Sequence, residues 1–151
     1  MIKKLDPFSA PLVWREFLFN SVLLQWQAGK LQGRAGNFDK KILASNLGLL
    51  VLRKKKLSEM AAAEAQLSKH PDEFIVMYRE GSGWSSVFKS LRDMTAHGDF
   101  SSEKNGWITI MHRYKGPREK TESTRLFGRL KFKTLKALVQ FIDQSQAASG
   151  K

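Results

Sequence analysis

The hydrophobic pattern of this chain changes its period once, and that change constrains the fold more than any other feature. From about Pro11 to His97, apolar residues recur every three or four positions, as they do on buried helix faces. From Trp107 to Phe132, β-branched and aromatic residues flank a Gly-Pro turn region, which is the pattern of a β-hairpin with a long loop. We therefore expect a mainly α fold, in which a helical bundle is followed by a basic hairpin and a final helix.

Several segments in the first part have helical spacing. The first, roughly Pro11 to Leu31, carries apolar side chains around most of its circumference, so it is either central or also faces a partner subunit. A second long helix is expected within "AGNFDKKILASNLGLLVL" (35–52). The segment "LSEMAAAEAQLSK" (57–69), rich in helix-forming alanine and glutamate, either continues it or starts a third. "PDEFIVMYRE" (71–80) has the pattern of a short helix or turn.

A chain of 151 residues with 42% hydrophobic residues is expected to form a single domain over 1–151. Its helical part covers 10–104, and its hairpin and last helix cover 105–146. The tail at 147–151 is expected to fray. Thr134 is expected to cap the last helix, whose buried stripe is Leu135, Leu138, Val139 and Ile142.

The charge of the chain indicates an anionic partner. Lys and Arg number 26 against 14 Asp and Glu, which gives a net charge of +12 and a pI near 10.1. Nucleic acid is the first candidate and a membrane surface the second, while a merely solvated surface is the alternative. In the second hairpin arm, alternation places cationic side chains on one face and apolar ones on the other. The RNA-binding candidates are Arg113, Arg125, Arg129, Lys131 and Lys133.

Several classes of site are excluded by composition. The chain has no cysteine, which rules out disulfides, thiolate zinc sites and cysteine nucleophiles and fits a cytoplasmic protein. Asp6, Arg15 and Glu16 interrupt any signal-peptide core, and no apolar run reaches membrane-spanning length. We therefore expect a soluble protein without a membrane partner. The chain also lacks a Gly-rich phosphate loop and a dinucleotide fingerprint.

The segment "SSVFKSLRDMTAHGDF" (85–100) starts as an amphipathic helix and ends in a group of polar residues. Asp93 and His97 are four residues apart, so on a helix the carboxylate can fix the tautomer of the imidazole. Arg92 and His97 are five apart, about 140° around an ideal helix. They would meet if the helix frays near Ala96, or if a second copy lies alongside. Gly98 is a natural helix-ending residue.

The stretch "LRDMTAHGDF" resembles the R-x(4 to 6)-H motif of the HEPN superfamily, the helical domains of many prokaryotic toxin, phage-defence and CRISPR-associated ribonucleases. The resemblance covers roughly residues 10 to 100. It implies a HEPN-like helical-bundle homodimer whose two motifs face each other across a cleft and cut RNA without a metal or cofactor. Arg92 would bind phosphate, His97 would act as acid or base, and Asp93 is the polar residue that commonly follows the arginine. Where one branch of the family has a modifiable tyrosine, this chain has Asp99, so control by nucleotide transfer is unsupported.

The sequence leaves several functional interpretations open. The first is a metal-independent endoribonuclease of a toxin or phage-defence type, in which Arg92 and His97 serve attack by the 2′-OH. The second is a non-catalytic nucleic-acid-binding or regulatory module that uses the basic hairpin. The third is an interaction subunit that docks an acidic antitoxin. His97 has two further readings, as a helix C-cap or, with Asp99, as a metal ligand.

Overall fold

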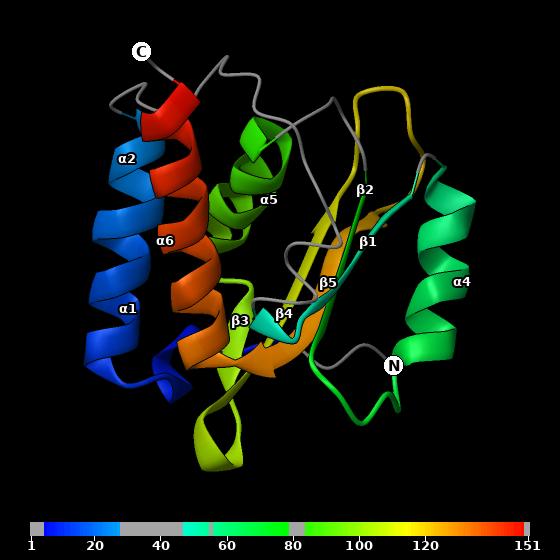
Figure 1. The fold of residues 1–151 in the computed structure, drawn as a ribbon. Helices are drawn as coiled ribbons and strands as arrows, with labels where there is room; N and C mark the ends of the chain where they lie inside the picture. Colours follow the sequence, from blue (N-terminus) through cyan, green and yellow to red (C-terminus); the bar gives the residue numbers. More distant parts are fainter. Residues whose placement is uncertain (1–4, 28–46, 55, 79–83, 150–151) are drawn as a thin grey trace.

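A five-stranded mixed sheet forms the centre of the structure, a computed structural model that describes residues 5–27, 47–54, 56–78 and 84–149 (Figure 1). The strand order is β1-β2-β5-β4-β3; β1 and β2 are parallel and all other neighbours are antiparallel. The prediction of a mainly α, HEPN-like helical bundle is therefore wrong. The strands are β1 (Leu50–Lys54), β2 (Phe74–Tyr78), β3 (Phe100–Ser102), β4 (Trp107–Tyr114) and β5 (Ser123–Lys131).

Three strands are missing from the sequence-based prediction: β1, β2 and the short β3, which lies within the part that was expected to be helical. β2 has four consecutive buried residues, Phe74 to Met77, because helices cover both faces of the sheet there. A continuous apolar run of this length lacks the alternation that distinguishes a strand, so periodicity alone reads it as a helix or turn. β1 begins at Leu50, inside the segment that was expected to be a second long helix. The part of that segment before residue 47 lies outside the described residues.

The helices agree better with the sequence pattern. The first expected helix is present from Leu12 to Gln27, with a π-helical turn in its middle, and residues 28–31 lie outside the described part. The alanine-rich segment is a separate helix after β1. The helices are α1 (Leu12–Leu18), η2 (Phe19–Leu23), α2 (Leu24–Gln27), α4 (Leu57–Leu67), α5 (Trp84–His97) and α6 (Phe132–Ser149), with short 3-10 turns η1 (Pro7–Ser9) and η3 (Lys104–Gly106).

The helices form two layers, one on each face of the sheet (Figure 1). α1, α2, α5 and α6 cover one face, where Phe88, Leu91 and Ile110 belong to the larger hydrophobic core. α4 covers the other face and packs Met60 and Ala63 against a smaller cluster. Since β2 pairs with β5, the sheet joins the part of the chain before residue 104 to the part after it.

The last helix begins two residues earlier than its expected cap. Phe132 is its first residue, and Thr134 is buried within the first turn rather than capping it. The helix is described as far as Ser149, into the tail that was expected to fray. The expected stripe is confirmed, since Leu135, Leu138, Val139 and Ile142 are all buried.

A β-bulge interrupts the alternation of the hairpin. His112 on β4 pairs with Leu126, but the next residue, Arg113, pairs with Thr124, so Arg125 is an extra residue in β5. Strict alternation would place Arg125 on the α4 face with Phe127, which packs into the smaller cluster. The bulge instead brings Arg125 to the wall of a cavity beside α5.

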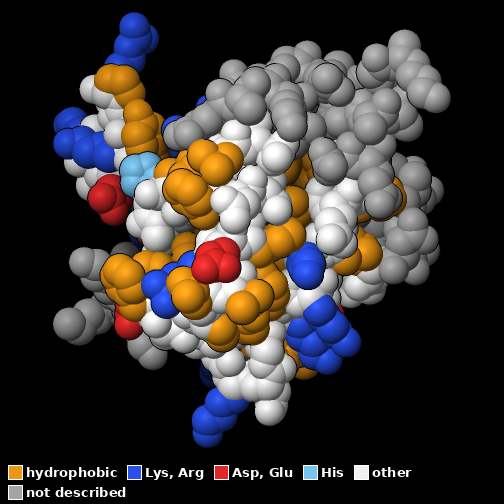
Figure 2. Space-filling model, turned by 90° about the vertical axis from the view of Figure 1, so that its left-hand side faces the viewer, with side chains coloured by type: hydrophobic (Ala, Val, Ile, Leu, Met, Phe, Trp, Pro, Cys, Tyr) orange, Lys and Arg blue, Asp and Glu red, His pale blue; other side chains and the backbone are white. Residues whose placement is uncertain are grey.

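Apolar side chains also lie on the surface of the first helical layer. Figure 2 shows the side of the molecule formed by the α1 and α6 layer, with hydrophobic side chains in several patches and lysines or arginines around them. Among the side chains of 12–25, which the structure describes, the exposed large hydrophobic residues are Leu12, Val13, Phe19 and Leu24. None of the described helices is both long enough and apolar enough to cross a membrane.

Candidate functional site

A cavity of about 320 Å³ lies beside the C-terminal half of α5, at the end of the sheet where β2, β4 and β5 meet. Arg92 and His97, the two residues of the sequence motif, both border it. α5 remains helical through His97, so neither fraying nor a second copy is needed for both to reach the same cavity. The lining residues are Tyr78, Lys89, Ser90, Arg92, Asp93, His97, His112, Tyr114, Arg125 and Leu126.

The end of α5 sets the position of Asp99. Gly98 has a left-handed backbone (φ +66°), as expected for the residue that ends a helix. The N–H of Gly98 donates to the carbonyl of Thr95 at 3.2 Å, and the N–H of Asp99 donates to the carbonyl of Met94 at 2.9 Å. These two bonds close the helix and turn the chain into β3. The carboxylate of Asp99 is thereby directed toward β4.

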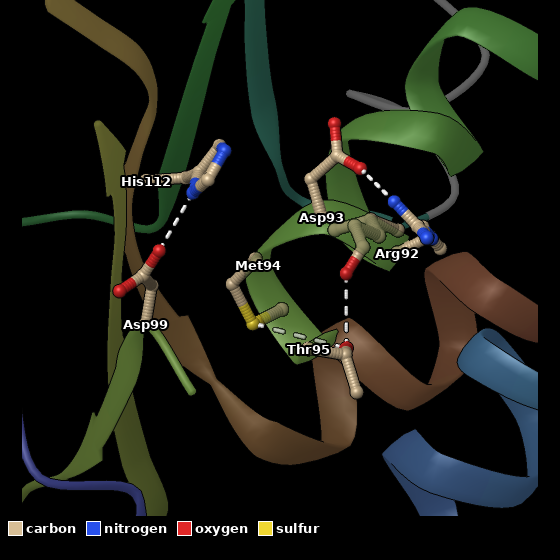
Figure 3. Close-up of polar contacts among 7 residues, drawn as sticks. Arg92, Asp93, Met94, Thr95, Asp99 and His112 are labelled. Atoms are coloured by element: carbon tan, nitrogen blue, oxygen red, sulfur yellow. Dashed lines mark hydrogen bonds and ion pairs between the residues drawn. The ribbon is translucent and has the colours of Figure 1, made fainter. Parts of the chain in front are cut away.

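Asp99 holds a histidine that the sequence analysis did not select. The Nδ1 of His112 lies 2.6 Å from Oδ2 of Asp99, and Figure 3 shows the carboxylate pointing at the ring. An ionised carboxylate only accepts hydrogen bonds, so Nδ1 carries the proton and donates. In the neutral imidazole this leaves Nε2 as an acceptor. His112 is 6% exposed, so its ring is buried, and the hydrogen bond to Asp99 fixes the orientation of the ring.

The two imidazoles lie next to each other. The ring centroids of His97 and His112 are 4.9 Å apart, with 32° between the ring planes. His97 is exposed and His112 is buried, although both border the cavity. The sequence did carry a signal for His112. In the alternating pattern of β4, His112 falls on the same buried face as Ile108 and Ile110.

Other polar residues of the motif make hydrogen bonds within α5 itself. Asp93 contacts Arg92, with Oδ1 of Asp93 2.7 Å from NH1 of Arg92 (Figure 3). The hydroxyl of Thr95 donates to the carbonyl of Leu91, one turn earlier in the same helix, at 2.9 Å. Nε of Arg92 is buried and has no hydrogen-bond partner among the described residues, which leaves this guanidinium with an unmet donor.

Three of the predicted RNA-binding residues are arginines that contact carboxylates. Arg113 contacts Glu64 at 2.7 Å, and Arg129 contacts Glu103 at 3.1 Å. Arg125 donates to both carboxylate oxygens of Glu119. Each of these arginines thus has a carboxylate partner. Two lysines remain from the predicted set: Lys131 ends β5, and Lys133 lies in the first turn of α6.

The described residues contain no group of three or more His, Asp or Glu side chains arranged to hold a metal ion. Comparison with protein-family models, curated proteins and solved structures finds no significant match. The function is therefore inferred from the cavity itself: two imidazoles, one oriented by a carboxylate, beside a guanidinium.

Proposed function

We propose that this chain is a metal-independent endoribonuclease whose site is the cavity bordered by Arg92, His97 and His112. The observation that supports this most is the pair of neighbouring imidazoles, one of them held by Asp99, at a cavity that also contains Arg92. Cleavage of RNA by its own 2′-OH requires a proton acceptor, a proton donor and a cation for the charge on phosphate. These three side chains supply one group for each requirement.

The roles follow from the environment of each side chain. His112 donates through Nδ1 to Asp99, so its Nε2 accepts the proton of the 2′-OH, and Asp99 stabilises the imidazolium that forms. The 2′ oxygen bonds to phosphorus while the bond from phosphorus to the 5′ oxygen breaks. His97 in its protonated form gives its proton to that 5′ oxygen. The products are a 2′,3′-cyclic phosphate and a 5′-hydroxyl.

Arg92 neutralises the charge that develops on the phosphate oxygens. Asp93 occupies one of its terminal nitrogens, so the guanidinium is held on α5 while other donors remain. Because one chain supplies all of these groups, the proposed reaction needs no second copy.

The test is an RNA cleavage assay on wild type, Arg92→Ala, His97→Ala and His112→Ala, with His70→Ala as a matched histidine control that does not border the cavity. Losing a general acid or base is expected to lower the rate by about 10²- to 10⁴-fold. The double variant of His97 and His112 should be little slower than either single variant, because the two act as a unit. The His70 variant should cleave at the wild-type rate.

Product analysis and a chelator sharpen the assay. A cyclic 2′,3′-phosphate end and unchanged activity in excess EDTA are expected. Activity that disappears with EDTA would favour metal-assisted hydrolysis instead. Wild-type protein that is folded but cleaves neither structured nor unstructured RNA would refute the proposal.

A non-catalytic nucleic-acid-binding module is the second candidate. It is favoured by a separate opening between α1 and the start of α6, which is bordered by Lys131, Lys133 and Lys136. Together with the net charge of +12, these lysines suit a phosphate backbone. RNA binding without cleavage in the same assay is the outcome that this candidate predicts.

A further inference from the structure

One cation lies close to two aromatic rings at the border of the candidate site. The guanidinium carbon of Arg125 lies 5.2 Å from the ring centroid of Tyr78 and 5.4 Å from that of Tyr114. Both distances are within the range of cation–π attraction. All three residues line the cavity that contains Arg92 and His97.

A carboxylate also holds Arg125 in place. Both carboxylate oxygens of Glu119 accept hydrogen bonds from NH2 of Arg125. Glu119 also accepts from the N–H of Gly116 at 2.6 Å, and its own N–H donates to the Gly116 carbonyl at 3.0 Å. The loop between β4 and β5 is therefore tied to Arg125. The two hydrogen bonds to Glu119 hold the guanidinium of Arg125 beside the two rings.

Tyr114 is the more exposed of the two rings, at 48%, while Tyr78 is half-buried. Exposure of a large aromatic ring at the mouth of a cavity, with the ring backed by a fixed guanidinium, provides a flat and rigid surface. Nucleobases stack on such surfaces, and stacking is the usual way in which proteins hold unpaired bases.

We propose that Tyr114 is a stacking platform for one unpaired nucleobase, which makes single-stranded RNA the substrate class of this site. The inference rests on the proposed endoribonuclease function and names its substrate. A cavity of about 320 Å³ accepts one small group, not a double helix, so a base that reaches Tyr114 must have left its duplex. The phosphate beside that base then lies toward Arg92 and the two histidines.

The experiment measures binding without cleavage. The probe is a short fluorophore-labelled RNA with 2′-O-methyl groups throughout, which removes the nucleophile, and it is used as a single strand and as a duplex with its complement. Fluorescence anisotropy gives the affinities of wild type, Tyr114→Ala, Tyr114→Leu and Tyr114→Phe. Phe19→Ala is the matched control, since Phe19 is a similarly exposed aromatic residue (49%) that does not border the cavity.

The platform predicts a selective effect of the ring. Single-strand affinity should fall roughly 10-fold or more in Tyr114→Ala and Tyr114→Leu, should be kept in Tyr114→Phe, and should be unchanged in Phe19→Ala. Duplex affinity should be the same in all of them. Tyr114→Leu keeps apolar bulk, so it tests the ring even if the alanine variant does not fold.

Two results separate this inference from the proposed function. If wild type cleaves RNA but Tyr114→Leu binds the single strand as tightly as wild type, the platform is wrong and the nuclease stands. If the single strand binds through Tyr114 but unmodified RNA is never cut, the nuclease is wrong. If the Tyr114 variants lose the same affinity for the single strand and for the duplex, the platform is also wrong, because such a loss does not depend on an unpaired base.

Discussion

Removal of the Asp99 carboxylate should destabilise the fold by an amount that the structure allows us to estimate. In Asp99→Ala, Nδ1 of His112 loses its 2.6 Å partner while the ring remains buried. An unsatisfied buried donor costs about 1–3 kcal/mol. The Asp99 side chain is 30% exposed, so water can partly replace the carboxylate, and we expect the lower part of that range, about 1–2 kcal/mol.

Thermal unfolding followed by circular dichroism is the assay, with urea titrations to obtain the free energy of unfolding. At this chain length, each kcal/mol lowers Tm by about 2–4 °C, so Asp99→Ala should melt roughly 2–8 °C below wild type. Asp99→Asn keeps an oxygen acceptor and loses only the charge assistance, so its loss of stability should be smaller. Asp72→Ala, which removes an exposed carboxylate, should lie within about 0.5 kcal/mol of wild type.

The comparison between Asp99→Ala and Asp72→Ala decides the outcome. If the two variants unfold at the same urea concentration, with the same slope, then the bond between Asp99 and His112 contributes nothing to the fold. Our reasoning that Asp99 fixes the tautomer of His112 would then be refuted as well, because a bond that orients a buried ring must also have a measurable free energy.

Two further changes test the sheet and the layer behind it. A Cβ on Gly128 would lie 2.8 Å from the carbonyl oxygen of Phe74 on the neighbouring strand, so Gly128→Ala should cost about 1–3 kcal/mol in the free energy of unfolding, measured by urea titration. A loss below about 0.5 kcal/mol would contradict the observed strand pairing. Glu64 on α4 accepts from Arg113 and from the buried Thr124, so Glu64→Ala should lower Tm by several degrees, about 2–4 °C per kcal/mol, whereas the exposed Gln66→Ala on the same helix should not.

Local sequence signals determined the elements whose pattern is complete within a short segment. The periodic apolar residues of α5, the helix-ending Gly98 and the buried stripe of α6 were all predicted from the sequence and are confirmed. The hairpin of β4 and β5 was also predicted, because two alternating segments beside a turn need no distant partner to be recognised.

Pairing across long sequence separations decided the rest of the fold. β1 and β2 are parallel strands joined through α4, and each is recognisable as a strand only once the other, and β5, are in place. β2 carries a continuous apolar run because both faces of the sheet are covered there, and such a run fits a helix equally well.

In the candidate site too, some residues were predicted from the sequence and others were brought together only by strand pairing. Arg92 and His97 were predicted from a short sequence motif that lies within one helix. Asp99 and His112 are thirteen residues apart and meet only because β3 pairs with β4, where the N–H of Met111 donates to the Asp99 carbonyl at 3.1 Å. Arg125 reaches the cavity only because a bulge in β5 breaks the alternation that the sequence displays. Alternation is a property of one strand, whereas register and bulges depend on the neighbouring strand, and for that reason only the tertiary structure decided them.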